Sequence, residues 1–267
     1  MRANFIKMIS PIRFRESSVK KDPTDGRNPF DSDYSRIVLS SHFRRLQDKA
    51  QVFPLERSDF IRTRLTHSLE VACFARGLGL GVEKHLLKKK IITETEIGYI
   101  PTILEVAGLI HDIGNPPFGH FGEEIIKSYF QKIKSFSDDN LIKNAFDSLT
   151  DEQQADFLNF DGNVQGFRIL RKLGLAHDNF SYNLTMPILA TIIKYPYSSL
   201  EGNKKMSDGG KYSQKKYGYF TSEKEDYNRA IEIINEGILE NKDEGFLYYN
   251  RACFYVCINK LDLALED

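Results

Sequence analysis

A histidine and an aspartate, His111 and Asp112, stand side by side at the end of an apolar stretch in this 267-residue chain. A turn rich in glycine and proline follows at 114–119, and a second histidine and acid, His120 and Glu123, come just after it. Neutral imidazole and carboxylate groups are good ligands for divalent metal ions, and a bound ion activates water. The stretch therefore indicates a metal centre with hydrolytic chemistry.

A third histidine, His67, lies at the start of another apolar pattern with helical spacing. A histidine on one helix and a His-Asp pair on the next can converge on a single ion. Judged by residue type alone, ordinary polar positions at the edge of a core remain an alternative. A further pair, His177-Asp178, lies in polar sequence, and we expect it in a solvated loop.

The composition bounds the class of protein. A hydrophobic content of 41% supports a real core, and 37 basic residues balance 37 acidic ones, so no global field directs the chain to nucleic acid or to a membrane surface. No run of about 18 apolar residues occurs, as a transmembrane helix would need. Three cysteines form no even disulfide framework. We expect a cytoplasmic protein with no membrane partner; single-stranded nucleic acid stays open as a partner but is not indicated.

The hydrophobic periodicity is helical throughout. Pro101 is a favoured first-turn residue, and Gly114 is typical of a helix end. Sustained alternation with period two is missing, so the sequence predicts an all-α fold. The predicted helices cover 33–53, 69–80, 101–113, 122–133, 163–173 and 185–194.

Changes in amino-acid composition and hydrophobic pattern divide the chain into three parts. We expect a polar, turn-rich segment at 1–32, a main helical domain at 33–222 and a helical tail at 223–267, with residues 198–218 read as a loop or linker. The tail resembles an incomplete tetratricopeptide repeat, because a segment 34 residues later is loosely similar in sequence to its opening residues. An ordinary helical pair is the alternative. Such a tail is a candidate site for a protein partner.

Several blocks resemble, in the same order, motifs of the deoxyguanosinetriphosphate triphosphohydrolases (dGTPases) of the HD-domain phosphohydrolase superfamily. The likeness covers about residues 30–225. The blocks that carry it are 43–54, 62–68, 111–123, 160–166, 183–185, 194–196 and 216–220.

The resemblance implies an HD-domain helical fold and hydrolysis of deoxynucleoside triphosphates, dGTP by preference, to a deoxynucleoside and tripolyphosphate. It also implies a divalent cofactor, Mn²⁺ or Mg²⁺ first and Fe, Co or Zn as alternatives, and a symmetric homo-oligomer. Three of the family's four metal ligands match His67, His111 and Asp112, and its catalytic pair matches His120 and Glu123. Substrate contacts are implied for Arg45, Gln51, Arg64 and Asn115.

The likeness weakens where the family supplies its fourth ligand, an Asp on a later helix. No residue here lies in a recognisable copy of that helix, although Asp226, Glu232 and Glu236 are acids at a plausible distance in sequence. We therefore expect a truncated or recombined member. Two alternatives to an active dGTPase stay open: an impaired relative that binds nucleotide or docks a partner through its tail, and an HD phosphohydrolase for another nucleotide.

Overall fold

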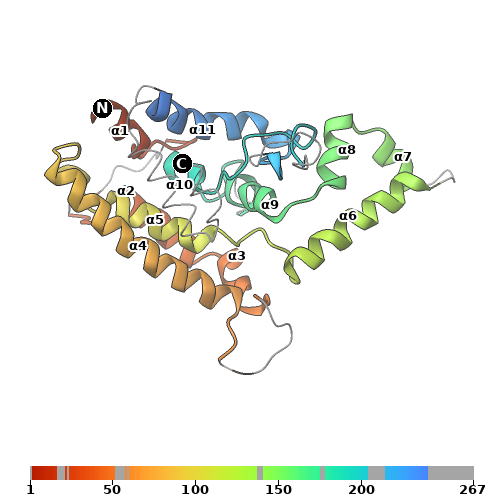
Figure 1. Ribbon diagram of the computed structural model, residues 1–267, viewed down its shortest axis with the longest axis horizontal. Coiled ribbons are helices and arrows are strands. Elements are labelled where there is room, and N and C mark those ends of the chain that lie inside the picture. The colour runs from red at the N-terminus through yellow and green to blue at the C-terminus, as the bar shows by residue number, and fades with distance from the viewer. Residues whose placement is uncertain are drawn as a thin grey trace.

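The computed structural model describes residues 2–16, 22, 24–51, 58, 60–136, 141–174, 178–203 and 214–239, with side chains given from Phe5 to Glu232. Helices dominate these ranges, and they contain no β-strand (Figure 1). Two isolated antiparallel bridges join Arg13 to Thr185 and Ala50 to Thr63. The prediction of an all-α fold is confirmed. None of the described helices has both the length and the apolar character needed to cross a membrane.

The first half of the chain supplies the central helices. Their bounds are α1 Arg2–Met8, α2 Pro29–Val38, α3 Ser41–Arg44, the 3₁₀ turn η1 Arg45–Asp48, α4 Arg64–Lys88, the 3₁₀ turn η2 Glu94–Glu96 and α5 Tyr99–Ile110.

The second half wraps around them. Its elements are α6 Gly119–Ser135, α7 Leu141–Asp147, α8 Asp151–Leu158, α9 Gly162–Arg168, the π-helical turn η3 Ile169–Leu173, α10 Met186–Thr191, the 3₁₀ turn η6 Thr221–Glu223 and α11 Lys224–Leu239.

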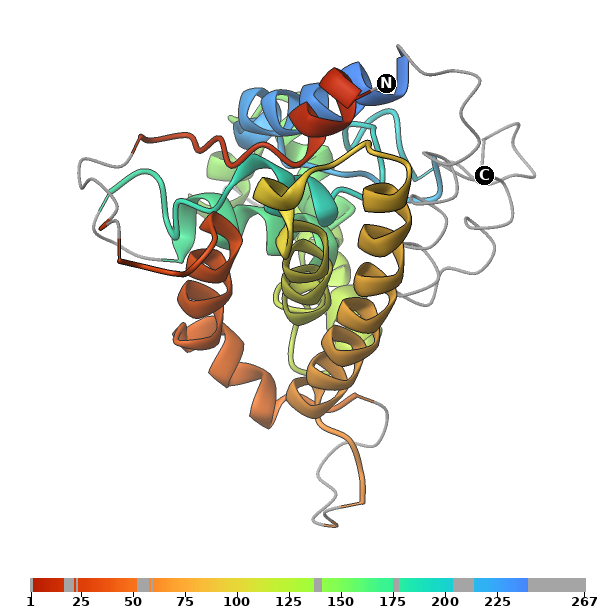
Figure 2. The ribbon, with the colours of Figure 1, turned by 90° about the vertical axis from the view of Figure 1, so that its left-hand side faces the viewer.

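Helices α4 and α5 lie side by side and form the framework of the molecule (Figure 2). They touch backbone to backbone at two places: a Cβ on Gly79 would lie 2.7 Å from Pro101 Cα, and one on Gly108 would lie 2.5 Å from Ala72 Cα. The two contacts are seven residues apart on each helix and run in opposite directions, so the pair is antiparallel and closely packed. Each close approach requires a residue without a side chain.

The other helices complete one core around this pair. Helix α2 and helix α10 both pack against α5, and α11 lies beside α1 and α10 (Figure 1). The N-terminal segment, expected to be polar, contributes Phe5 and Ile9 to the core through α1 and the turn after it. Burial of this apolar surface is the main force that holds α1 and α11 against the framework.

The helix predicted over 33–53 is wrong as a single element. The first helix starts earlier than predicted, at Pro29, because Asn28 just before it forms a capping box with Asp31 in its first turn. It ends at Val38, and a new turn begins because the Ser40 side chain accepts a hydrogen bond from the amide of Phe43. Capping side chains therefore override the apolar periodicity here.

Other helix boundaries differ from the predicted ones by up to eight residues. The helix predicted over 69–80 extends over Arg64–Lys88, since Thr63 caps its start by accepting a bond from the amide of Thr66. The helix predicted over 163–173 is α9 followed by the π-helical turn. Residues 204–213 of the predicted linker and 240–267 of the tail lie outside the described residues, so the repeat-like tail stays a prediction.

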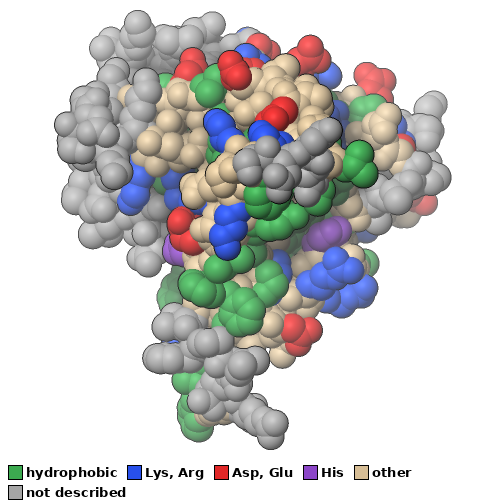
Figure 3. All heavy atoms as spheres, turned by 90° about the vertical axis from the view of Figure 1, so that its right-hand side faces the viewer, with side chains coloured by type: hydrophobic (Ala, Val, Ile, Leu, Met, Phe, Trp, Pro, Cys, Tyr) green, Lys and Arg blue, Asp and Glu red, His purple; other side chains and the backbone are tan. Residues whose placement is uncertain are grey.

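Helix α6 exposes an apolar stripe on the side of the molecule shown in Figure 3. Its members, spaced three or four residues apart, are Phe118, Phe121, Ile125 and Tyr129. The opposite face buries Glu123 and Ile133. The helix is thus held by one face only, and that face includes a carboxylate.

The close contact between α4 and α5 yields a stability prediction. Replacing Gly108 with Ala should force the helices apart, because the new methyl would overlap Ala72, and overpacking costs about 1–3 kcal/mol. In a chain of this size the melting temperature should fall by about 2–10 °C in a thermal scan. The matched control is Gly77→Ala on the outer face of α4, where a Cβ meets nothing within 4 Å. That variant should be neutral or stabilising; equal losses in both would contradict the packing argument.

Candidate metal centre and catalytic pair

Three of the residues singled out from the sequence meet at one end of the α4–α5 pair. One ligand atom each from His67, His111 and Asp112 lies within 4.8 Å of the other two. The two imidazole rings are 5.2 Å apart, centroid to centroid. His67 sits in the first turn of α4, whereas His111 ends α5, so the antiparallel packing of these helices brings the three side chains together.

The tautomer of His111 is set by the helix that precedes it. Its Nδ1 lies 2.7 Å from the carbonyl oxygen of Gly108, and a carbonyl can only accept, so Nδ1 carries the proton. Burial lowers the pKa of His111, although the charge of Asp112 acts in the opposite direction. The imidazole is therefore neutral, and its Nε2 lone pair faces Asp112, whose Oδ2 lies 3.6 Å away.

Both oxygens of Asp112 are held in place. Oδ2 accepts a hydrogen bond from Arg64 Nη1 at 2.7 Å, and Oδ1 accepts one from Asn115 Nδ2 at 2.6 Å. Burial alone raises the pKa of Asp112, but the electrostatic interactions with His111, Arg64 and Lys194 outweigh it and leave the pKa below its ordinary value. The carboxylate is therefore ionised and oriented.

Arg64 reaches this position through a gap left by a glycine. Gly119, the first residue of α6, has φ +55°, a left-handed conformation that favours glycine. A Cβ there would lie 2.6 Å from Arg64 Nη2. The buried guanidinium thus lies between Asp112 and the start of α6, and its Nε has no hydrogen-bond partner within the described part of the chain.

The second histidine and acid form a separate pair on α6. His120 Nδ1 lies 2.9 Å from Glu123 Oε2; the imidazole is 87% exposed, whereas the carboxylate is 3% exposed. Glu123 Oε1 accepts a hydrogen bond from the amide of Gly162, at the start of α9. Lys216 lies 3.8 Å from Glu123 and is also paired with Asp161. A fixed carboxylate thus orients an imidazole that faces solvent.

The donor set fits a divalent ion. Two imidazoles and one carboxylate suit borderline metals, and three protein ligands leave coordination positions open for water or substrate. The hydrogen bonds from Arg64 and Asn115 do not exhaust Asp112, since a carboxylate offers about four lone-pair positions. The three residues can therefore hold an ion without losing their present contacts.

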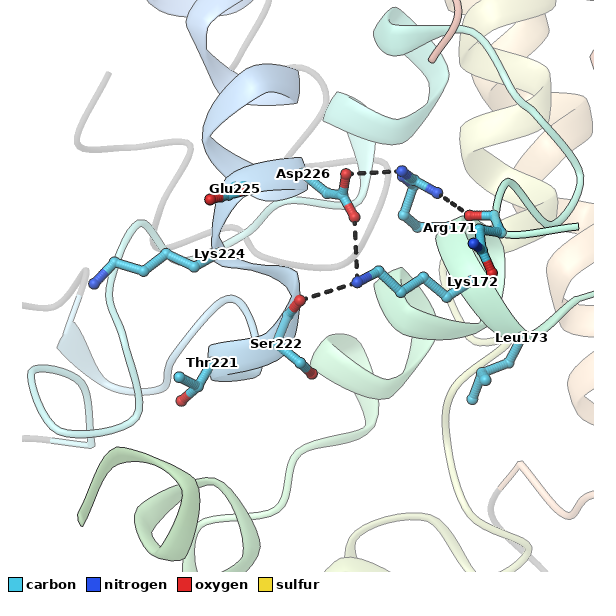
Figure 4. A pocket seen from close by; sticks show the side chains of 9 residues that line it. Arg171, Lys172, Leu173, Thr221, Ser222, Lys224, Glu225 and Asp226 are labelled. Atoms are coloured by element: carbon cyan, nitrogen blue, oxygen red, sulfur yellow. Dashed lines mark hydrogen bonds and ion pairs between the residues drawn. The ribbon is translucent and has the colours of Figure 1, made fainter. Parts of the chain in front are cut away.

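No fourth ligand joins the three among the residues whose side chains are described. Asp226 instead pairs with Arg171 at 2.8 Å and with Lys172 at 3.5 Å (Figure 4). These side chains line a cavity of about 720 Å³ between η3 and the start of α11. Glu232 takes no part in the metal cluster, and the side chain of Glu236 lies outside the described residues.

The structure brings most of the predicted substrate residues toward this end of the helix pair. Arg64 and Asn115 touch Asp112, as described above. Gln51 follows the bridge that joins Ala50 to Thr63, and its buried Oε1 has no hydrogen-bond partner in the described ranges. Arg45 is exposed on η1.

Sequence reasoning assigned no role to three lysines near the site. Lys49 binds backbone carbonyls of the turn after α5, and Lys216 approaches Glu123. Lys194 donates to Asn163 Oδ1 at 2.6 Å, and its charge lowers the pKa of both His111 and Asp112. All three lie in blocks that carry the family resemblance, and this could have pointed to them from the sequence. Only the fold shows which groups they contact.

Comparison with known proteins agrees with this arrangement. The HD domain family matches residues 64–193, a range that contains the candidate metal cluster and the His120–Glu123 pair. Deoxyguanosinetriphosphate triphosphohydrolase-like proteins of Listeria innocua and Synechocystis sp. are each 44% identical, over 83% and 78% of this chain. A deoxyguanosinetriphosphate triphosphohydrolase of Klebsiella pneumoniae is 36% identical over 80% of it.

The matched region covers 47%, 46% and 45% of these relatives, so the chain spans about half of their length. Residues 64–193 of the chain match the HD-domain family, and the chain as a whole is similar to the deoxyguanosinetriphosphate triphosphohydrolase-like proteins.

Proposed function

We propose that this chain is a metal-dependent phosphohydrolase that acts on deoxynucleoside triphosphates, with dGTP as the first candidate substrate. The observation that carries the proposal is the convergence of His67, His111 and Asp112 beside a separate imidazole–carboxylate pair. The names of the relatives support the choice of substrate. Hydrolysis at the α-phosphorus would consume one water and release a deoxynucleoside and tripolyphosphate.

The metal cluster would bind the ion and the reacting phosphate together. A bound divalent ion supplies a Lewis acid for the phosphate and lowers the pKa of water at the site. His67, His111 and Asp112 would hold that ion, with Asp112 oriented by Arg64 and Asn115. Mn²⁺ and Mg²⁺ are the first choices, and the imidazole ligands also suit Fe, Co and Zn.

Cationic side chains near the cluster would orient the triphosphate. The Arg64 Nε is buried and unpaired in the described part of the chain, which suits an added oxygen ligand. Lys194 places a second positive charge near His111 and Asp112. Arg45 would contact other parts of the nucleotide, as would the Gln51 amide oxygen, which has no hydrogen-bond partner among the described residues. Positioning and charge neutralisation supply most of the rate in phosphoryl transfer.

His120 would move the proton that the reaction requires. Because Glu123 Oε2 is the partner of Nδ1, the other ring nitrogen, Nε2, is directed toward solvent and can reach a bound substrate. When the bond to the 5′ oxygen breaks, the imidazole can donate a proton to that oxygen and recover it from water. Glu123 keeps the ring in one tautomer and orientation.

The main test is direct assay. Purified protein incubated with dGTP and Mn²⁺ or Mg²⁺ should yield deoxyguanosine and tripolyphosphate, separated by chromatography, and a panel of other nucleotides should give slower turnover. The substitutions Asp112→Asn and His67→Ala should abolish product and weaken Mn²⁺ binding by about tenfold or more. His85→Ala, at the exposed far end of α4, is the control and should behave as wild type. Metal binding without turnover of any nucleotide would instead support the impaired, nucleotide-binding alternative.

Substitution of Arg64 should affect catalysis more than substitution of its exposed neighbour Arg62. Arg64→Gln should lower kcat/KM about 10- to 100-fold, since a hydrogen bond to a charged group contributes about 1.5–3 kcal/mol. Arg62, which pairs with Glu70 on the surface, is the matched control, and Arg62→Gln should change kcat/KM less than about twofold. Similar kinetics for both variants would remove Arg64 from the substrate site.

The catalytic pair should affect turnover more than metal binding. His120→Ala should lower kcat about 10²- to 10⁴-fold, the usual contribution of general acid–base catalysis, with Mn²⁺ affinity unchanged. Glu123→Gln should also slow turnover, because it weakens the bond that orients the imidazole. Glu124→Gln changes an exposed neighbour and serves as the control. If His120→Ala retained full kcat, the assignment of the proton donor would be wrong.

A further inference from the structure

Lys49 lies at the end of η1, where the chain turns toward the start of α4. Its half-buried side chain reaches across to the turn that follows α5. There Nζ donates a hydrogen bond to the carbonyl oxygen of Asn115 at 2.7 Å and approaches that of Ile113 at 3.4 Å. Carbonyl oxygens in a turn have no regular secondary-structure partners, so a hydrogen-bond donor is favourable there.

The backbone of the same residue holds the other helix. The carbonyl oxygen of Lys49 accepts a hydrogen bond from the amide of Arg64, the first residue of α4, at 3.0 Å. The adjacent bridge between Ala50 and Thr63 strengthens this attachment. One residue therefore ties the start of α4 to the turn after α5.

These two segments carry the candidate ligands. His67 lies one turn into α4, and Asp112 is bonded both by Arg64 at the start of α4 and by Asn115 in the turn. A shift of either segment would move the carboxylate away from the two imidazoles. The cross-link made by Lys49 fixes the distance between the two segments.

The ammonium group of Lys49 has an unfavourable setting. Burial and the charge of Arg64 lower the pKa of Lys49, while Asp112 raises it. Its hydrogen bonds to the two carbonyls offset part of this cost. An apolar side chain could fill the same space but could not donate to either carbonyl, so the bonding capacity of the lysine is the property that matters.

We propose that Lys49 is a positioning residue that holds the His111–Asn115 turn in register with α4 and so sets the geometry of the metal cluster. The proposal depends on the proposed function in one respect only, namely that the cluster binds a metal ion. The cross-link made by Lys49 is a feature of the fold and does not depend on it. Lys49 acts through the backbone and Asp112 and does not contact the reacting atoms.

The substitution Lys49→Met, which keeps length and removes the donors, tests this. Hydrogen–deuterium exchange in the metal-free protein should rise in the turn at 113–118 and stay unchanged in α11. Mn²⁺ affinity, followed by electron paramagnetic resonance of the free ion, should fall about tenfold or more, as is usual when outer-sphere partners of a metal site are lost. Lys49→Arg keeps donors that can reach the carbonyls and should restore most of the affinity. Lys84→Met, on the exposed far part of α4, is the control.

The readouts distinguish the alternatives. In an active enzyme, Lys49→Met should lower kcat with little change in the KM for nucleotide. A raised KM with unchanged Mn²⁺ affinity would overturn the proposal and place Lys49 on the substrate. Unchanged exchange of the turn would also overturn it, whether or not the protein binds Mn²⁺ or hydrolyses nucleotide. Absence of turnover in the wild type, with exchange and affinity altered as expected, would reject the proposed function and leave the role of Lys49 standing.

Discussion

The backbone contact between α4 and α5 is the constraint on which the site depends. Because Gly108 and Ala72 allow the helix axes to approach closely, residues near the start of one helix face residues near the end of the other. His67 and His111 occupy those positions and come within ligand distance of Asp112. The candidate ligands lie on α4 and in the turn directly after α5, and both segments are packed in place in the fold, so most of the cost of organising a metal site there would be met by folding.

Electrostatics give this small region a character that the whole chain lacks. Net charge is zero, yet the carboxylate of Asp112 is surrounded by Arg64, Lys49 and Lys194, each close enough to affect a titrating group of the cluster. Around Asp112 itself these cations outnumber the acid, and local positive charge of this kind suits a triphosphate. The cationic character is therefore built into the fold and does not rely on exposed side chains, which salt would screen.

Hydrophobic periodicity predicted the helical class, and the family resemblance singled out His67, His111 and Asp112, which the fold brings together. The sequence did not predict the break at Ser40, since a side-chain cap competes with apolar periodicity and only the folded geometry decides between them. The role of Lys49 was also hidden, because its partners are backbone carbonyls 64 and 66 residues away, and such bonds leave no trace in residue type. Long-range contacts through the backbone are what sequence patterns describe least well.

The two parts of the site are anchored to different portions of the structure, and this has a mechanistic consequence. The metal cluster belongs to α4 and α5, whereas His120 is oriented by Glu123, whose other oxygen is bonded to the amide of Gly162 at the start of α9. The alignment of the proposed proton donor with the candidate metal cluster therefore depends on how α9 packs against the turn after α5. That packing is tight, because a Cβ on Gly114 would lie 2.0 Å from the carbonyl oxygen of Gly162. Changes in α9 should thus uncouple proton transfer from metal binding without touching a residue of either cluster.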